Sequence, residues 1–547
     1  MEAAGALGRG SLSTYLEALR VLVRSRSRAF WIVAGLTVLA AALRFATLGV
    51  QSYHHDEIVT ASRVLRDGFW HAMDAVGFSE SAPPLYYALA WLWTQVTGTG
   101  EVGLRSFSAL AGVATVPVAF LVASELRRRN ADCGVDHTMR GSIPQSATWT
   151  GVVAAALVAV NPMLVWYSQE ARAYSLLVLL TSLSLLYFVR ACDVPSLGRP
   201  FEPLGDGTSG RRRDLILWGV FSGLALATHY FAVFAIAAEA VWLLHRRGRE
   251  AARGAGIVAA FGLALAPLAI HQMSYGHAEW IANHTLGHRL WELGVAFSVG
   301  EIGDIVARPE RPLLALVPAA AMLVALSLLA LRGERGERRA AAPMLAIATV
   351  AVATPLALAL LDSGKDYVLA RNLLPALPAL LVAVAVGLTL RRARRAGAIL
   401  AAALVAYSLG FSVWASLSPA LQRPGWDAVA STLGEPTTPR AMVTWTLGEA
   451  SLRYYLSTGS FQAKPSEGFD WSVGEVDFIS DGPAPPPPTR LLGPGFRQVG
   501  YERAGRLHIR RYARPGPGLA PLRLGTVREA ELGFRTNGVL LDGIGPR

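Results

Sequence analysis

Residues 28–57 read RAFWIVAGLTVLAAALRFATLGVQSYHHDE. The stretch begins with an apolar run of about twenty residues, long enough as a helix to cross the hydrocarbon core of a bilayer. It ends in Tyr53–Glu57, where two imidazoles precede two adjacent carboxylates. Charged groups beside a membrane are costly and usually functional, so this ending predicts a site at the outer end of the first span.

Similar apolar runs recur through the chain, which has 547 residues, 52% of them hydrophobic and 16% charged. This pattern predicts a polytopic α-helical membrane protein with about eleven transmembrane helices. The predicted spans are about 30–49, 104–126, 147–165, 174–190, 215–229, 231–245, 254–271, 312–331, 341–361, 372–390 and 396–417.

Arginine supplies nearly all of the positive charge behind the net charge of +12. The arginines stand in short tracts between the apolar runs, where the positive-inside rule operates, so membrane orientation explains them and no nucleic-acid partner is expected. The tracts that we expect to be cytoplasmic lie at 127–129, 211–213, 246–247, 332–339 and 391–395. We therefore predict a multi-pass protein of the cell membrane with a cytoplasmic N-terminus at 1–29, an uncleaved first span, and Tyr53–Glu57 outside.

Two segments of the first external loop are expected to lie at the membrane interface. Residues 57–76 mix polar and apolar side chains, as interfacial helices do. Residues 84–98 are apolar but short for a crossing, and Trp91 and Trp93 are typical of the interfacial aromatic belt. If 84–98 crossed the membrane, every later arginine tract would be inverted, so we favour a re-entrant or interfacial helix.

The composition changes after Ser418, where polar stretches become longer and no further span follows. Strand-like segments such as 440–446 and 507–512 predict a small external α/β domain over 418–515. Residues 516–547 are expected to form a flexible, loosely ordered tail. The chain thus divides into a cytoplasmic N-terminus, a transmembrane catalytic domain over 30–417, the external C-terminal domain and the tail.

Polar residues gather at the predicted outer ends of the spans. They are His54, His55, Asp56, Glu57, Glu80, Gln169, Glu170, Arg172, His229, Tyr230, Lys365, Asp366, Arg371 and Asn372. Acids beside cations suit a site that holds a phosphate leaving group while a carboxylate deprotonates an acceptor.

The motifs around these residues occur in a characteristic order. They are Asp56-Glu57, 81–87 (SAPPLYY), 104–110 (LRSFSAL), 167–174 (YSQEARAY), 228–231 (THYF) and 371–378 (RNLLPALP). In that order, residues 30–420 resemble the GT-C membrane glycosyltransferases. The nearest resemblance is to bacterial relatives of protein O-mannosyltransferases and of the lipid A aminoarabinose transferase, in glycosyltransferase family 39 and its neighbours.

The resemblance implies a sugar donor linked to polyprenyl phosphate and an inverting transfer on the outer face. It implies mannose or a pentose as the sugar and an extracytoplasmic lipid, glycan or protein as the acceptor, with membrane lipids around the spans. By motif, Asp56 would be the general base that takes the proton of the acceptor hydroxyl. Glu57, the second residue of the catalytic pair, would support Asp56 or the conformation of its loop.

Glu170 and Arg172 lie at the outer end of a predicted span. The resemblance implies that the acid Glu170 joins Asp56 at the cavity and that these two carboxylates are candidate ligands of a divalent cation; the alternative is that Glu170 and Arg172 form an ion pair that fixes the loop. The chain departs from the family at Ala82, where a histidine or lysine commonly precedes the proline. A cation for the donor phosphate must then come from elsewhere. Arg371 is the first choice because a guanidinium offers several donors, and Arg172, His229 with Tyr230, and His55 are the other candidates.

Two rival interpretations start from the same features. A membrane transporter or lipid flippase would also place acids and cations in its spans, but it predicts mid-span charges and paired repeats, which the sequence hardly shows. The second rival keeps the scaffold without catalysis and leaves the external domain as a binding module. The joint presence of Asp56, Glu57 and Glu170 argues against it.

Overall fold

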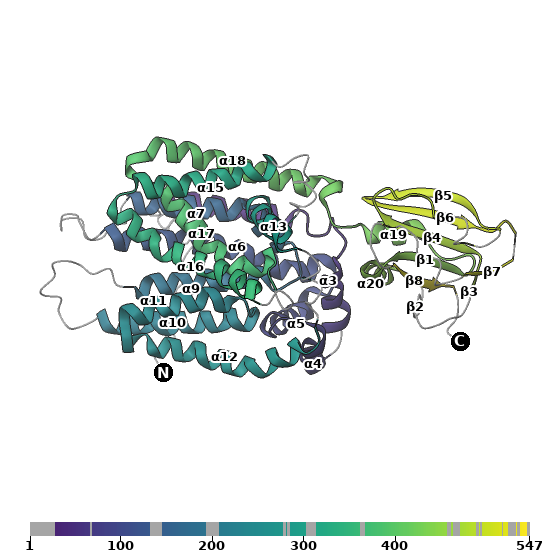
Figure 1. Cartoon of the computed structure of the whole chain (residues 1–547), viewed down its shortest axis with the longest axis horizontal. Helices are drawn as coiled ribbons and strands as arrows, with labels where there is room; N and C mark the ends of the chain where they lie inside the picture. Colours follow the sequence, from purple (N-terminus) through teal and green to yellow (C-terminus); the bar gives the residue numbers. More distant parts are fainter. Residues whose placement is uncertain are drawn as a thin grey trace, which may run out of the picture.

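The computed structural model is a bundle of long helices with a small mixed sheet beside one end (Figure 1). It describes residues 28–65, 68–131, 145–192, 207–276, 281, 285–301, 313–361, 367–456, 461–462, 471–487, 492, 495–516, 518–522, 532 and 537–543. Most of the N-terminal segment expected in the cytoplasm, residues 1–27, lies outside this part of the chain.

Each of the predicted spans coincides with helical structure. The helices are α2 (Arg28–Phe45), α6 (Glu101–Ala131), α7 (Gln145–Val160), α8 (Pro162–Ser168), α9 (Tyr174–Ala191), α10 (Gly207–Thr228), α11 (Ala232–Arg247), α12 (Ala252–Met273), α15 (Leu313–Arg332), α16 (Arg335–Leu361), η4 (Ala370–Ala376) with α17 (Leu377–Leu388), and α18 (Arg394–Leu417). Within the described residues, eight helices are long and apolar enough to cross a membrane, or nine if the bent pair α7–α8 is one span. The protein is therefore a multi-pass membrane protein, while the count of about eleven remains a prediction because α10 and α11 fall outside this set.

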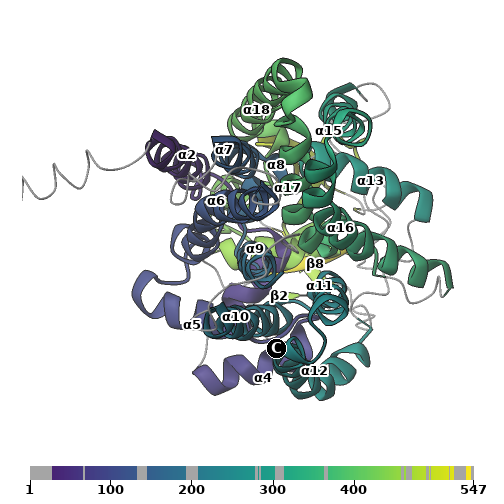
Figure 2. The ribbon, with the colours of Figure 1, turned by 90° about the vertical axis from the view of Figure 1, so that its left-hand side faces the viewer.

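The bundle is built around α9 and α17, the two most deeply buried candidate spans. Figure 2 shows the other helices ranged around α9, with α2, α12 and α18 at the periphery. Several arginine tracts meet at one end of the bundle. There, Glu337 accepts from Arg127 Nη2 and from the backbone N–H of Arg391, both at 3.1 Å. The loop between α2 and α6 and the sheet lie at the opposite end (Figure 1).

The bend between α7 and α8 is stabilised by an arginine from α2. The two helices meet at 55°, where Asn161 caps α8 and Pro162 supplies no backbone donor. The buried Arg44 side chain donates to the carbonyl oxygens of Ala159 at 2.8 Å and Val158 at 3.2 Å, which the bend leaves without helical partners. The guanidinium thus serves as the C-cap of α7.

A carboxylate in α11 was missed by the sequence analysis because its span is otherwise apolar. Glu239 is buried between α9 and α10, where it accepts from Trp218 Nε1 at 2.6 Å and Ser184 Oγ at 2.5 Å. Neutral donors surround it, which is how a buried polar group avoids the cost of an unmade hydrogen bond.

Short helices form the loop between α2 and α6, and its interfacial position stays a prediction. They are α3 (His55–Val59), the π-helical turn η1 (Thr60–Val64), α4 (Phe69–Ser79) and α5 (Leu85–Thr97). None of these helices is among the candidate spans of the described chain, and α5 packs beside α6 and α10. Helix α13 (Leu286–Val299) lies at the same end and contacts α8 and α15.

The C-terminal domain is a six-stranded sheet in the order β2-β8-β1-β4-β6-β5, with β3 and β7 paired separately. Its elements are α19 (Trp426–Leu433), β1 (Arg440–Trp445), α20 (Thr446–Tyr455), β2 (Phe461–Gln462), β3 (Trp471–Val473), β4 (Glu475–Asp481), β5 (Arg497–Ala504), β6 (Leu507–Ala513), β7 (Ala520–Leu522) and β8 (Asn537–Asp542). Helices α19 and α20 lie between the sheet and the bundle (Figure 1). The strands expected at 440–446 and 507–512 are confirmed as β1 and β6.

The expectation of a loose tail over 516–547 is corrected where the structure describes this segment, at β7 and β8. Strand β8 pairs antiparallel with β1 along its whole length, from Arg440 opposite Asp542 to Trp445 opposite Asn537. All six residues of β8 are buried, and Arg440 forms a buried ion pair with Asp542 at 2.7 Å. Local composition could not show this, because the strand is short and its partner lies about a hundred residues earlier.

Candidate active site

The Asp56 loop begins with a capping box at the N-terminus of α3. The His54 ring Nδ1 accepts from the backbone N–H of Asp56 at 3.4 Å, and Glu57 accepts from the backbone N–H of His54 at 2.8 Å. These bonds satisfy N–H groups that a helix start otherwise leaves without partners. Residues His54–Glu57 therefore supply the hydrogen bonds that form their own turn, and Asp56 lies in the first turn of α3.

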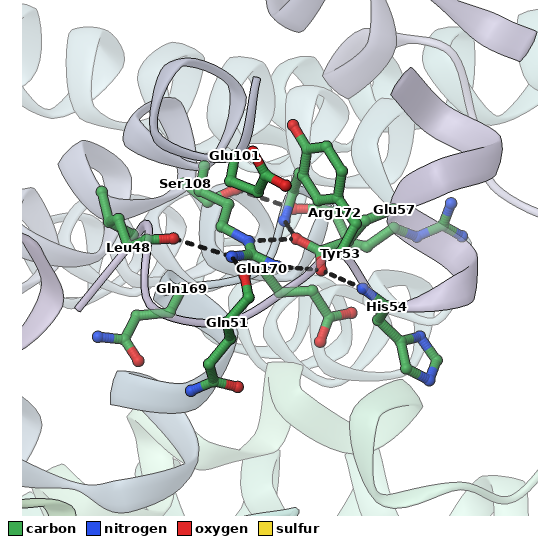
Figure 3. A network of polar contacts seen from close by, with 12 residues as sticks. Leu48, Gln51, Tyr53, His54, Glu57, Glu101, Ser108, Gln169, Glu170 and Arg172 are labelled. Atoms are coloured by element: carbon green, nitrogen blue, oxygen red, sulfur yellow. Dashed lines mark hydrogen bonds and ion pairs between the residues drawn. The ribbon is translucent and has the colours of Figure 1, made fainter. Parts of the chain in front are cut away.

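Glu57 is fully buried and joins this turn to α6. Its carboxylate accepts from Arg105 Nε at 2.7 Å and Nη2 at 2.8 Å, and from the backbone N–H of Ala171 at 2.8 Å. Arg105 Nη1 also donates to the carbonyl oxygens of Leu48 and Gln51 (Figure 3). Burial opposes ionisation of Glu57, but Arg105 outweighs it and holds the pKa of this carboxyl below its ordinary range. Glu57 has no free oxygen for a substrate proton, and its geometry is that of a positioning residue.

A second buried pair lies next to the first. Arg423, from the segment after α18, donates from Nη2 to Glu170 at 2.8 Å and from Nη1 to the carbonyl of Gln169 at 3.0 Å. Its guanidinium also lies 4.5 Å from the centre of the Trp166 ring and 3.8 Å from Glu57. Glu170, expected at the cavity, is therefore bound to a residue that the sequence analysis did not consider.

Arg172 connects the Asp56 loop to the segment before α5. Its Nη1 lies 2.8 Å from one Glu80 oxygen and donates to Thr60 Oγ1 at 3.1 Å. Burial raises the pKa of Glu80, while Arg172 opposes that shift. The charge of Arg172 is thus largely neutralised by Glu80, although Arg172 still favours the ionised form of Asp56.

Asp56 differs from its neighbours because it remains reachable. Its side chain is 27% exposed, and its Oδ2 lies 3.6 Å from Arg371 Nη1, whose side chain is 22% exposed. Burial disfavours the charged carboxylate, but Arg172 and Arg371 outweigh that effect and hold the pKa of Asp56 well below its ordinary value. An ionised carboxylate and a guanidinium thus lie side by side, on α3 and η4, at the same end of the bundle.

The remaining candidates for a phosphate-binding cation are less suited. Burial, followed by Arg172 and Arg371, lowers the pKa of His229 to about 3, so this imidazole is neutral near pH 7. Burial also lowers the pKa of His55. Tyr230 donates to Gln272 of α12 at 2.8 Å.

The structure brings Asp56, Glu57, Glu170, Arg172 and Arg371 together, with His229 beside them. Two important residues, Arg105 and Arg423, had no assigned role in the sequence analysis. Arg105 was detectable, because an arginine inside an apolar span generally has a buried partner. Arg423 lies in a polar linker, where arginine is unremarkable, and no local signal marks it.

The residues expected to hold a divalent cation were Asp56 and Glu170. In the described part of the chain, no three His, Cys, Asp or Glu side chains converge on one point. Glu170 is moreover bound by Arg423 at 2.8 Å. These residues do not form the oxygen cage that Mg²⁺ or Ca²⁺ requires, so a metal requirement stays a prediction and enters none of the chemistry below.

A protein-family model matches residues 82–252, and its description is Protein O-mannosyl-transferase TMEM260 N-terminal domain. The matched segment contains Glu170, Arg172 and His229 but neither Asp56 nor Arg371. No curated protein matches the chain.

Solved structures resemble most of the chain. ArnT from Cupriavidus metallidurans in the apo state has a TM-score of 0.52 at 15% identity, over 89% of this chain and 98% of ArnT. The same ArnT bound to undecaprenyl phosphate has a TM-score of 0.47 at 14% identity over the same shares. The Pmt1-Pmt2 protein O-mannosyltransferase complex of S. cerevisiae, bound to the sugar donor, has a TM-score of 0.31 at 18% identity, over 45% of this chain and 33% of that one.

The fold and the family match define the class of protein. The chain has the GT-C fold and is a membrane glycosyltransferase. The resemblance predicted from the ordered motifs is thereby confirmed.

Proposed function

We propose that this protein transfers a sugar from a polyprenyl-phosphate donor to a hydroxyl group of an extracytoplasmic acceptor, with inversion at the anomeric carbon and Asp56 as general base. The observation that carries the proposal is the partly exposed Asp56 carboxylate beside Arg371, in a GT-C fold. The donor, the base and the outer-face orientation are inferences from this geometry and from the sequence motifs.

In the proposed reaction the acceptor oxygen attacks the anomeric carbon as Asp56 takes the acceptor proton. The bond between the anomeric carbon and the phosphate oxygen breaks on the opposite side, and the polyprenyl phosphate departs with the bonding electrons. The low pKa of Asp56 keeps the base ionised, and general-base assistance typically contributes about 10²–10⁴-fold to the rate.

Arg371 would bind the phosphate that carries the developing negative charge. A guanidinium can donate two parallel hydrogen bonds to phosphate oxygens. Arg172 has a weaker claim because its side chain is 13% exposed, against 22% for Arg371. Arg371 thereby takes the role left open by Ala82, whose backbone oxygen accepts from Gln272 Nε2 at 3.1 Å.

The sugar is mannose or a pentose, and the family match favours mannose with a protein acceptor. Detergent-solubilised enzyme should therefore be supplied with polyprenyl-phosphate mannose and, separately, with a polyprenyl-phosphate pentose. Hydroxyl-bearing lipids, glycans and peptides serve as acceptors, and transfer is measured by mass spectrometry.

The decisive variant is Asp56→Asn, which keeps the size of the side chain but removes its basicity. Transfer should fall by about 10²-fold or more while the melting temperature stays close to that of the wild type. Asp74→Asn, on the exposed side of α4, is the matched control and should transfer normally. Near-normal transfer by Asp56→Asn would exclude Asp56 as the base.

The transporter or flippase alternative gains no support from the described spans. Its best candidate group, Glu239, is 1% exposed and is enclosed by hydrogen bonds from α9 and α10. A transport pathway requires mid-membrane charges that can be reached from a cavity.

A further inference from the structure

Three consecutive residues just before α3, at positions 51–53, are contacted by the segment after α18 and by the C-terminal domain. The side chain of Gln51 accepts from the backbone N–H of Arg423 at 3.1 Å. Ser52 Oγ is hydrogen-bonded to the Asp427 carboxylate and accepts from its backbone N–H at 3.2 Å. Tyr53 donates its backbone N–H to Tyr455 Oη at 2.7 Å.

These contacts immediately precede the capping box that carries Asp56. The Tyr455 hydroxyl also donates to Glu101 at 2.6 Å, so it joins the loop to the start of α6. Tyr53 is itself buried, and its hydroxyl donates to the carbonyl of Thr99 at 2.8 Å. The backbone before Asp56 is thereby held from both sides, by the bundle and by α20.

Arg423 also attaches the segment after α18 to a second turn of the site. Its guanidinium binds Glu170 and the carbonyl of Gln169, both in the turn that leads to Arg172. One buried side chain thus connects the linker after α18 to the two turns that carry Asp56 and Arg172.

We propose that the C-terminal domain is a positioning element for the transferase site, and that Arg423 and Tyr455 are its positioning residues. The inference rests on the proposed function, because it assigns these contacts to the placement of Asp56 against Arg371. Neither residue touches substrate. Each acts by fixing the loop that presents the base, and a misplacement of about 1 Å in such a group can cost about 10²-fold in rate.

The test uses the full-length enzyme with Tyr455→Phe and Arg423→Lys. Tyr455→Phe removes only the hydroxyl shared by Tyr53 and Glu101, and Arg423→Lys keeps the charge but loses the forked contact. Tyr501→Phe and Arg506→Lys are matched controls from β5 and the β5–β6 turn. Their partners, His508 and Asp481, lie within the domain, away from the loop.

We expect kcat to fall by about 10- to 100-fold in the two loop-contact variants, with donor KM unchanged because the Arg371 site is intact. The pH profile should change as well. The charged and titratable groups that act on Asp56 are Arg172, Arg371, His54 and His55, with Glu80 and Tyr174 from the neighbouring elements. A loop that moves away from the two arginines lets the pKa of Asp56 rise towards its ordinary value of about 4, so transfer is lost on acidification earlier than in the wild type.

Unchanged kcat and pH profile in Tyr455→Phe would overturn the proposal, and so would an equal loss of kcat in the control Tyr501→Phe. If Arg423→Lys fails to fold, Tyr455→Phe alone tests the proposal, because this substitution deletes a single oxygen atom. Asp56→Asn separates the two hypotheses. Normal transfer by that variant refutes the proposed function, whereas its inactivity beside a fully active Tyr455→Phe refutes only the positioning role.

Discussion

Replacement of Glu57 by glutamine should destabilise the whole protein. The wild-type carboxylate accepts two hydrogen bonds from Arg105, which is 1% exposed, and two from backbone N–H groups of Ala171 and His54. Glutamine is neutral and has only one side-chain oxygen. The Arg105 guanidinium therefore stays buried without its anion, and the NH2 group of the glutamine points at N–H donors from which it cannot accept. Removing one partner of a buried ion pair costs about 3–5 kcal/mol, and we expect a loss of that size in the free energy of unfolding.

The assay is reversible urea unfolding in detergent, followed by tryptophan fluorescence and repeated for a double-mutant cycle with Arg105→Gln. The double variant should be less destabilised than the sum of the single variants, because it removes both buried charges. Glu125→Gln is the control, since the partners of Glu125 include the exposed Arg128. It should lose under about 1 kcal/mol. A loss of under about 1 kcal/mol in Glu57→Gln, or strict additivity in the cycle, would refute the reasoning.

The same pair predicts a pH dependence with a definite sign. The pKa of Glu57 is lower in the folded protein than its ordinary value of about 4.3 in the unfolded chain. The unfolded state therefore binds the proton first as the pH falls. The stabilisation by the pair is complete above about pH 4.3 and disappears as the pH falls through the folded-state pKa, and Glu57→Gln should lack this part of the acid sensitivity.

Three further predictions concern the donor site, a histidine and the last strand. Arg371→Gln should raise donor KM by about 10- to 100-fold in steady-state kinetics, because a charged hydrogen bond to phosphate contributes about 1.5–3 kcal/mol, and an unchanged KM would place the phosphate elsewhere. The pKa of His229 is about 3 when folded and about 6.5 when unfolded, so its neutral form stabilises the fold above pH 6.5 and this contribution is lost as the pH falls towards 3. His229→Gln should flatten that part of the stability profile, and an unaltered profile would contradict the assignment. Removal of 516–547 should unfold the C-terminal domain and expose it to protease, whereas removal of 544–547 should not; a resistant domain in the longer truncation would show that β8 is dispensable.

The transmembrane part was predictable because hydropathy and arginine placement are local properties. A span is recognised from about twenty consecutive residues, and every predicted run coincides with helical structure. The ordered motifs also identified Asp56, Arg172 and Arg371 as neighbours before any geometry was known. The proximity of Asp56 and Arg371 is confirmed at 3.6 Å.

The partners of these residues were not predictable, since each pairing spans a large separation in sequence. Arg105 meets Glu57 across 48 residues, and Arg423 meets Glu170 across 253. No periodic pattern in the sequence indicates such a contact, because a buried carboxylate can pair with whichever guanidinium the fold brings near it. The error over 516–547 has the same origin, since a short strand gains its stability from neighbours that are distant in the chain.

The position of β8 has a consequence for the synthesis of the protein. Asn537–Asp542 is translated after every other strand of the sheet, yet it lies between β2 and β1 inside the sheet. The sheet cannot close until β8 has left the ribosome, although the helical bundle is complete more than a hundred residues earlier. A chain terminated before β8 would therefore insert into the membrane with its helices in place and its C-terminal domain unfolded. Translation through β8 becomes a condition for a finished enzyme.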